Sequence, residues 1–413
     1  MSRASSLVST QNHVEAPFII VKIGEYTFGH CDKEYKNKLQ TQFNITYPNY
    51  MESLSIVKVN GAVNTYTLNM VYAITPTDDP NRLEKVFSSI SNSRLIYLSY
   101  GDWNAPSFVY KEEEAIITKL TTRLNVENST IQYTIQCTSN ALALTSGVLP
   151  FPARTDKPSD VLIELLTNRG YGLTNLFKGM EGKDPLLFIS GDDQTVELQA
   201  RTATILEYIS YLVSCMVFVG DDSESLKTSC YFWSVFDDTT NQYGGTYFKV
   251  VRVAANTNTA MSYNTYEVDI GYPTSNCVTG FSVNNDDSWA LLFDYAHTVS
   301  LPEYSYHIDD TGHVVQKTSS VVTASRLTHT TNEATRDWWS RVTQFPITAT
   351  LTMKGLLRPV MLTSYVKVNT LFYGHKHTSS GLYIITKQED SISKSGYRTT
   401  LTLLRVGGDE HYA

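Results

Sequence analysis

The sequence predicts a mainly β protein with an α+β insertion: two duplicated β-barrel domains, each with a flanking helix, separated by a small α/β domain. Strand-forming residues are abundant, with 27 tyrosines among 413 residues. Residues 114–137 and 381–403 echo one another, because an Ile-Ile-Thr-Lys strand is followed in both by a second strand with period-two alternation. Two ordinary hairpins can share these residues by coincidence. A duplicated barrel explains both the shared residues and their separation along the chain.

The first barrel is predicted over residues 17–145, after a polar N-terminal arm at 1–16. Its helix is well marked, because Asp79 can cap it, Pro80 suits the first turn, and apolar residues recur at helical spacing. The apolar stripe consists of Leu83, Val86, Phe87 and Ile90. The strands are expected at 18–21, 43–47, 66–72 and 94–100, and in the pair 114–119 and 131–137.

An α/β insertion domain is predicted over residues 146–261. Three prolines, at positions 150, 152 and 158, mark its start. A first helix is expected from the leucines at 162, 165 and 166, and a second begins with Thr204 and Glu207, which are spaced as a capping box. Strands are expected near 186–189, 231–236 and 248–253.

The second barrel is predicted over residues 262–407, followed by a short tail at 408–413. A polar loop is expected at about 302–330, with a turn at 309–312. A helical stripe that contains Trp338 and Trp339 is matched to the helix at 80–91, so that each barrel has one helix. The strands are expected at 266–272, 276–283, 347–353 and 366–369, and in the terminal hairpin 381–406.

Composition limits the class of protein. The net charge of −8 argues against a sequence-independent grip on nucleic acid, which requires clustered lysine and arginine. No apolar run approaches the ~20 residues needed to cross a bilayer, and the polar start lacks the layout of a signal peptide. The five cysteines are widely spread and never form a Cys-x-x-Cys pair, which favours buried free thiols in a reducing cytoplasm.

The histidines and cysteines predict neither a metal site nor a nucleophile. His375 and His377 share one face of a strand, as two zinc ligands would, but no third ligand lies at a recognisable spacing. A solvated loop is the better interpretation. His30 and Cys31 are adjacent in a strand and therefore point to opposite faces, so they do not form a catalytic pair.

Paired acids and paired tryptophans also have simpler interpretations than chemistry. Tandem acids such as Asp78-Asp79 adjoin turn residues, which favours turn and cap roles over acid/base or calcium sites. The Trp338-Trp339 pair has the helical spacing of a core stripe, with a sugar-binding or partner-binding platform as the alternative. We therefore expect no catalytic residue, no cofactor and no metal, and we expect that the protein is not an enzyme.

The second predicted barrel contains a recognisable series of motifs. Its strand Ala-Thr-Leu-Thr-Met-Lys-Gly at 349–355 is followed by a loop with Pro359 and a short strand at 365–368. The closing strands read Gly-Leu-Tyr-Ile-Ile from 381 and Gly-Tyr-Arg-Thr-Thr-Leu from 396. This series resembles the tail hub, or baseplate hub, proteins of contractile-tailed bacteriophages, a family that includes the late control protein D type. The resemblance extends over the whole chain in the order of elements, and it is specific over residues 345–406.

The resemblance implies two tube-type β-barrels per chain and a homotrimer. Three such chains would form a pseudo-sixfold hub ring that joins the tail tube to a central spike and lines the DNA ejection channel. The implied partners are a tail tube or distal tail protein, a central spike protein, the tape measure protein and baseplate wedge proteins, with DNA passing through unbound. The implied location is the virion tail baseplate, assembled in the host cytoplasm. An acidic chain suits a channel that must not retain phosphate groups.

Two other classes remain open at this point. A receptor- or glycan-binding adhesion protein would display aromatic residues on exposed loops. A hub-borne cell-wall hydrolase would need an additional catalytic domain, for which two barrels and an insertion leave little room.

A candidate subunit interface is predicted on the last strand of the chain. Its alternation places one set of side chains in a core and the other set on an outer face, where a neighbouring subunit could cover it. The outer set is Arg398, Thr400, Thr402 and Leu404.

Overall fold

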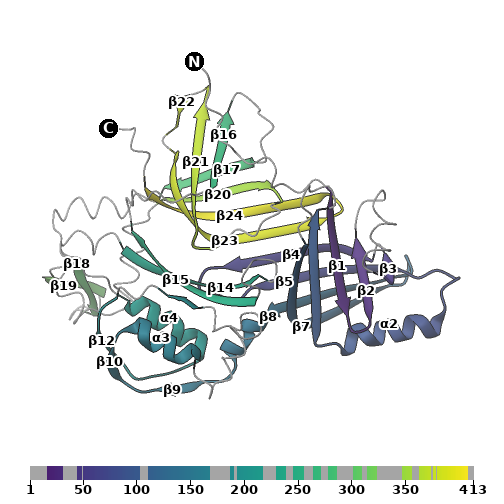
Figure 1. Cartoon of the computed structure of the whole chain (residues 1–413), viewed down its shortest axis with the longest axis horizontal. Coiled ribbons are helices and arrows are strands. Elements are labelled where there is room, and N and C mark those ends of the chain that lie inside the picture. Colours follow the sequence, from purple (N-terminus) through teal and green to yellow (C-terminus); the bar gives the residue numbers. More distant parts are fainter. Residues whose placement is uncertain are drawn as a thin grey trace.

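The computed structural model describes residues 16–30, 44–48, 50–102, 110–167, 187–189, 193–216, 229–238, 245–254, 264–270, 278–285, 301–308, 314–322, 347–355, 362–373, 375–377 and 379–407. These residues are mostly β, which confirms the predicted class. A 15-stranded sheet contains strands from both ends of the chain, and a smaller α/β region lies beside it (Figure 1).

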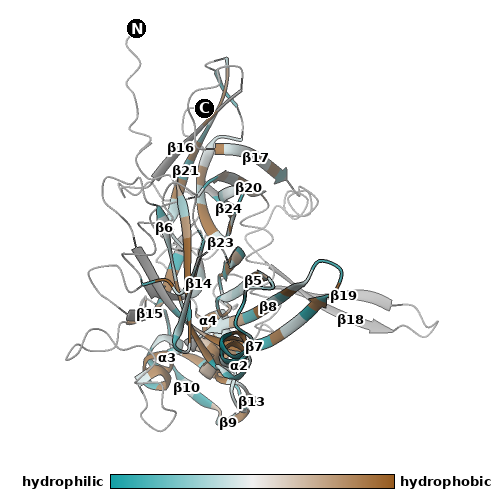
Figure 2. Ribbon diagram, turned by 90° about the vertical axis from the view of Figure 1, so that its right-hand side faces the viewer, coloured by the Kyte–Doolittle hydropathy of each residue, from teal (hydrophilic) through white to brown (hydrophobic). Residues whose placement is uncertain are grey.

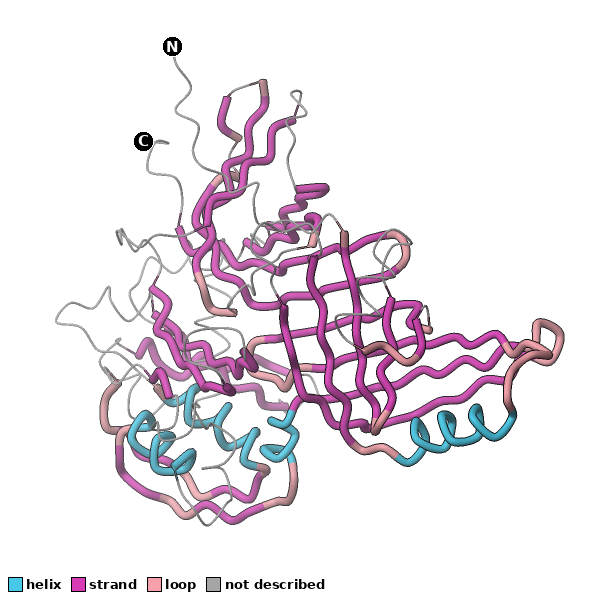
Figure 3. Tube along the Cα trace, turned by 45° about the vertical axis from the view of Figure 1, so that its right-hand side comes forward, coloured by secondary structure: helices cyan, strands magenta, loops and turns pink. Residues whose placement is uncertain are grey.

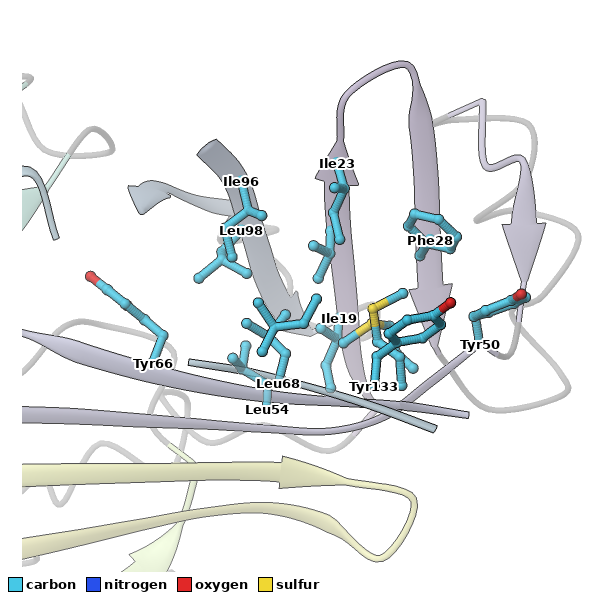
Figure 4. Packing of buried hydrophobic residues seen from close by; sticks show 14 of the residues in the cluster. Ile19, Ile23, Phe28, Tyr50, Leu54, Tyr66, Leu68, Ile96, Leu98 and Tyr133 are labelled. Atoms are coloured by element: carbon cyan, nitrogen blue, oxygen red, sulfur yellow. The ribbon is translucent and has the colours of Figure 1, made fainter. Parts of the chain in front are cut away.

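The first β unit contains eight strands and one long helix. Its elements are β1 (Pro17–Ile23), β2 (Tyr26–His30), β3 (Tyr47–Pro48), β4 (Met51–Val59), β5 (Thr65–Ala73), α2 (Pro80–Asn92), β6 (Leu95–Asp102), β7 (Tyr110–Asn125) and β8 (Thr130–Ser139). The sheet bends so that β1, β2 and β6 face β4, β5 and β8 across a common core, and β7 belongs to both layers. Figure 4 shows this core, with Ile19, Phe28 and Leu98 on one side and Leu54, Leu68 and Tyr133 on the other.

Helix α2 forms where the sequence predicts a helix. The backbone N–H of Asn81 donates to Oδ1 of Asp79 at 3.0 Å, and Pro80 occupies the first turn. Val86 and Ile90 are buried in the core of the first unit. The adjoining Asp78 accepts hydrogen bonds from the Tyr72 hydroxyl at 2.7 Å and from the Thr75 backbone N–H at 2.6 Å. This acid pair is therefore a cap and a turn, as expected.

The middle unit has its own core. Its elements are η3 (Asn140–Thr145), β9 (Leu149–Phe151), β10 (Arg154–Asp156), α3 (Pro158–Thr167), β11 (Leu187–Ile189), β12 (Val196–Leu198), β13 (Arg201–Ala203), α4 (Ile205–Cys215), β14 (Ser229–Asp238) and β15 (Gly245–Ala254). The predicted capping box is present, because Thr204 and Glu207 bond reciprocally to each other's backbone N–H. Ala141 and Leu144 pack into this core, so the unit begins before residue 146.

A buried carboxylate fixes the start of α3. Asp193 accepts from the Ser159 backbone N–H at 2.9 Å and from its hydroxyl at 2.5 Å. Burial raises the pKa of this carboxyl, while the two Ser159 bonds oppose the shift. Both carboxylate oxygens are used in holding the first turn of the helix, so Asp193 has a structural role.

The second β unit contains β16 (Asn264–Ile270), β17 (Val278–Asn285), β20 (Ile347–Lys354), β21 (Tyr365–Phe372), β22 (His375–Lys376), β23 (Gly381–Ser393) and β24 (Gly396–Gly407). Its core is built from alternate residues of these strands, among them Leu351, Val368, Tyr383 and Leu401. The predicted strands at 276–283, 347–353 and 366–369 and the terminal hairpin are confirmed.

The two β units share one strand order. Five strands of each unit can be numbered one to five in the order in which they occur along the chain. In the sheet, they lie side by side in the order one, two, five, four, three in both units. These strands are β4, β5, β6, β7 and β8 in the first unit, and β17, β20, β21, β23 and β24 in the second. The next strand differs, since β1 pairs antiparallel with β6 whereas β16 pairs parallel with β21.

Register irregularities also recur at equivalent positions. The β7–β8 register shifts between Ile117 and Lys119, and the β23–β24 register shifts between Ile385 and Lys387. The extra residue is Thr118 in one unit and Thr386 in the other. Each threonine hydroxyl donates to a backbone carbonyl of the opposite strand, at 3.1 and 3.2 Å. The repeated Ile-Ile-Thr-Lys sequence therefore encodes a β-bulge in both units. Duplication of two complete barrels remains a prediction.

Two sequence-based expectations need correction. Residues expected as a polar loop form a hairpin of β18 (Leu301–Ile308) and β19 (Val314–Val322). The second concerns the strand at 266–272, which begins earlier, at Asn264, and ends at Ile270. The helical stripe with Trp338 and Trp339 lies outside the described residues and stays a prediction.

A substitution at Gly355 tests how tightly the terminal hairpin packs where the two β units meet. A Cβ at this position would overlap the ring of Tyr397, which is buried in the core of the first unit. We expect Gly355→Ala to lower the free energy of unfolding by about 1–3 kcal/mol, because the ring must move. Gly280→Ala is the control, since its nearest heavy atom would be Thr352 Cβ at 3.8 Å. Urea unfolding compares the two variants, and equal midpoints would contradict the tight contact.

Candidate assembly interface

Strand β23 joins the two β units. Its residues 381–384 pair with β21 of the second unit, and residues 387–393 pair with β4 of the first unit. The change of partner occurs at the bulge of Thr386. Along its whole length the strand also pairs with β24. The two units are therefore connected edge to edge by backbone hydrogen bonds, and Figure 3 shows the strands running on from one unit to the other.

Side chains seal this internal junction. Ile392 and Tyr397, from the terminal hairpin, are part of the first unit's core. The Tyr100 and Tyr397 rings meet edge to face with centroids 6.4 Å apart. Asp390 is buried and accepts from the Thr399 hydroxyl at 2.6 Å and from the Gln388 amide at 2.7 Å. Burial of apolar surface and satisfied polar groups both stabilise the contact.

Strand β7 has a bulge at the same place as β23, and it changes its pairing there in the same way. After the bulge, however, no described strand takes the place that β4 has beside β23. Residues 110–116 pair with β6, and after the Thr118 bulge no described strand pairs with the outer edge of residues 118–125. The exposure of corresponding side chains shows this difference. Leu124 is 67% exposed, whereas Ile392, which has the corresponding place on β23, is 1% exposed. An apolar side chain on an open strand edge is typical of a surface that another strand covers.

Strand β17 also has an open edge. Among the described residues its only antiparallel partner is β20, and its opposite edge ends the sheet. Phe281 and Val283 correspond to Leu54 and Ile56 on β4, because each pair faces equivalent residues of the neighbouring strand. Leu54 and Ile56 are fully buried, whereas Val283 is 38% exposed and Phe281 is half-buried.

The outer face of eight neighbouring strands is rich in hydroxyl groups. The strands are β17, β20, β24, β23, β4, β5, β8 and β7, and hydrophobic and hydrophilic residues alternate along them, as Figure 2 shows for β7 and β8. Directly opposite residues form rows that cross the junction between the units. One such row is Arg398, Ser391, Ser55, Thr67, Gln136 and Lys119. We call this surface the hydroxyl face.

The charge on the hydroxyl face is sparse and more basic than acidic. Lys387 and Glu389 form an exposed ion pair at 2.5 Å, which contributes little to stability in water. The other charged residues of this face are Lys119, Arg123, Lys354 and Arg398, with Glu114 on the part of β7 that pairs with β6. The net negative charge of the chain is therefore not located on this face.

A cavity lies at the end of the hydroxyl face. Its volume is about 620 Å³. It lies between the start of β17, the end of β20 and the turn of the terminal hairpin, with Pro17 at one side. Two cations, Lys354 and Arg398, line it beside Thr279, Tyr397 and three serines of the terminal hairpin, and none of the described residues that line it is acidic.

The overall fold is similar to those of several solved tail proteins. A tail protein from Neisseria meningitidis matches with 9% identity and a TM-score of 0.48, over 95% of this chain and 97% of that one. A prophage tail protein from Shewanella oneidensis matches with 11% identity and a TM-score of 0.47, over 94% and 96%. A type VI secretion system component from E. coli matches with 9% identity and a TM-score of 0.45, over 88% and 75%. No family model matches the sequence, and a search of curated proteins finds no relative.

The predicted interface residues lie in the middle of the hydroxyl face. Arg398, Thr400 and Thr402 project from β24, whose two edges are both paired within the chain, with β20 and β23. Leu404 packs against the small cluster of Phe232 and Ile384, where β14 of the middle unit meets this face. A subunit contact through these side chains remains a prediction. The open edges, which periodicity cannot reveal, lie on β7 and β17.

The residues considered for chemistry do not form a site. His375 is exposed, and His377 Nδ1 lies 2.8 Å from the Ser379 hydroxyl. The described residues contain no group of three or more metal-ligating side chains. His30 is buried, while Cys31 lies outside the described residues. Burial raises the pKa of the Cys137 thiol to about 12, which keeps it protonated and unreactive at neutral pH. No helix among the described residues is long and apolar enough to span a bilayer.

A matched pair of substitutions tests the difference between the two bulged strands. We expect Leu124→Asp to change the free energy of unfolding by less than about 0.5 kcal/mol, because the side chain is exposed in a single chain. Ile392→Asp should cost more than about 4 kcal/mol, because it places a charge in the core. Urea unfolding at a concentration where the chain is monomeric measures both. Similar losses would mean that the outer edge of β7 is covered.

Proposed function

We propose that this chain is a structural tail protein that forms a trimeric, pseudo-sixfold hub ring between a tail tube and a central spike. The sequence supports this through the resemblance over residues 345–406. The fold supports it through two units with one strand order, which give a threefold assembly six similar parts. A sixfold tube and a threefold spike could then bind opposite sides of one ring.

The pairing of β23 with β4 is the observation that carries the proposal. It places the two units side by side in one sheet, as neighbouring parts of a ring wall must be. The same unit-to-unit contact can be repeated between chains only if complementary open edges exist, and β7 and β17 supply them. The middle unit has its own core and packs beside the sheet, outside this repeating arrangement.

The hydroxyl face is suited to line the channel of such a ring. Serine and threonine hydroxyls bond to water and offer phosphate groups no charge partner. Its cations are few: Lys354 and Arg398 are neighbours at one end, Lys119 and Arg123 lie on β7, and Lys387 is paired with Glu389, so the described part of this face has no long basic track of the kind that grips nucleic acid. DNA would therefore pass without specific retention. Tail tube or distal tail, tape measure and baseplate wedge proteins are the further partners that this role implies.

The proposal predicts a defined particle. Light scattering of the purified chain should give three times the mass of one chain, and adding a tail tube protein or a spike protein should increase that mass by the mass of the bound partner. Electron microscopy should show rings with a central channel. A chain that stays monomeric in every mixture, or a particle with no channel, would contradict the proposal.

A further inference from the structure

The cavity at the end of the hydroxyl face brings two cations together. Lys354 and Arg398 lie directly opposite each other on the paired strands β20 and β24, and both side chains are exposed. Like charges in directly opposite positions of an antiparallel pair repel each other and destabilise the sheet. No described residue forms an ion pair with either cation. Within the described part of the chain, the two charges therefore have no counter-charge.

Hydroxyl groups lie beside these cations. Ser391 is opposite Arg398 on β23, so Lys354, Arg398 and Ser391 form one row across three strands that lie side by side (Figure 1). The Ser391 side chain is exposed and makes no hydrogen bond to the described residues. Ser393 and Ser395 share one hydrogen bond of 2.7 Å between their hydroxyls, so these two side chains together keep one hydroxyl proton to donate.

Gly396 leaves the space beside this row open. It lies opposite Ser393 and two residues before Arg398, on the same face of the hairpin. A Cβ at Gly396 would have no heavy atom within 4 Å, and its φ of +122° favours glycine. The cavity volume of about 620 Å³ lies within the range of about 300–1,000 Å³ that is typical of small-molecule sites. An organic ligand with an anionic group therefore fits better than a small inorganic ion alone.

Three carboxylates of this region are engaged within the chain. Asp390 is 1% exposed and accepts from the Thr399 hydroxyl on the buried face of the hairpin. Asp102, at the end of β6, is 1% exposed and accepts from a backbone N–H at 2.9 Å. Glu389 forms the ion pair with Lys387. A ligand in the cavity thus meets cations and hydroxyls, with no carboxylate in the described lining.

We propose that this cavity binds the terminal phosphate of a phosphomonoester. Such a group has three free oxygens and a charge of about −1.5 to −2 at pH 7. Two cations and two available hydroxyl protons match this charge and this number of acceptors. Arg398 can bind two of the oxygens with its planar pair of N–H groups, and Lys354 supplies a compact second charge.

Other anions match the lining less well. A carboxylate has one charge and two oxygens, which Arg398 alone would satisfy. A phosphodiester within a nucleic-acid strand also has one charge and two free oxygens. The site therefore distinguishes a terminal phosphate from a strand that passes by, and it is compatible with DNA transit. A free mononucleotide and the 5′ end of a DNA strand both present the required group.

Calorimetric titration of the full chain tests the proposal. The probes are deoxyadenosine 5′-monophosphate and a short single strand of DNA that carries either a 5′-phosphate or a 5′-hydroxyl. Lys354→Gln with Arg398→Gln, the pocket variant, should bind the phosphorylated probes at least tenfold more weakly, because charge-assisted hydrogen bonds are lost. Lys119→Gln with Arg123→Gln is the matched control. It removes two exposed cations of the same face outside the cavity and should bind as the wild type does.

The results separate the two sources of the phosphate. Binding of the mononucleotide, with a loss only in the pocket variant, supports the proposal with a small ligand. Binding of the 5′-phosphorylated strand alone, with the same loss, supports it with a strand end. The proposal is overturned if neither phosphorylated probe binds, if the pocket and control variants bind equally, or if the 5′-hydroxyl strand binds as tightly as the phosphorylated one. None of these results depends on the proposed ring, which particle mass tests separately.

Urea unfolding gives a second test that also shows whether the variants fold. Without ligand, Arg398→Gln should raise the urea midpoint, because it removes the repulsion with Lys354. A saturating phosphorylated probe should raise the midpoint of the wild type and of the control, and leave that of the pocket variant unchanged. A lower midpoint for ligand-free Arg398→Gln would show that this cation already has a counter-charge and would overturn the proposal.

Discussion

The structure depends on a strand that changes partners in mid-course. Strand β23 pairs with β21 before Thr386 and with β4 after it, while β24 accompanies it throughout. The bulge permits this, because one additional residue turns the strand and releases one edge from its first neighbour. Without it, the terminal hairpin would belong to the second unit alone. Ile392 and Tyr397 would then not reach the core of the first unit.

The junction that results is part of the folded core. The buried Asp390 carboxylate accepts one hydrogen bond from the Gln388 amide and one from the Thr399 hydroxyl, at a place that both units exclude from water. A buried polar group without such partners would cost free energy, so these bonds favour one arrangement of the two units over alternatives. The orientation of the units is thereby set by the same contacts that stabilise the chain.

Local sequence patterns predicted those parts of the fold that depend on local chemistry. The helix at Pro80 was predictable because Asp79 and the apolar spacing act within a few residues. The hairpin at 301–322 was not, because its polar composition favours a loop when only propensities are considered. Period-two alternation identified the two faces of β24 and thus placed Thr400 and Thr402 outside the core. It could not show that both edges of β24 are paired, since edge partners come from residues distant in sequence.

The open edges of β7 and β17 belong to different strands, which has a consequence for assembly. If β7 of one copy paired with β17 of the next, the contact would be heterologous, and a twofold dimer could not satisfy both edges. Each copy added to such a row would cover the open edge at the end of the row and bring a new open edge with it. The row could therefore grow until its two ends meet. The curvature per copy then decides between a closed ring and an open filament. A β-bulge bends its strand, so the single additional residues at Thr118 and Thr386 would contribute to the curvature that such a row follows.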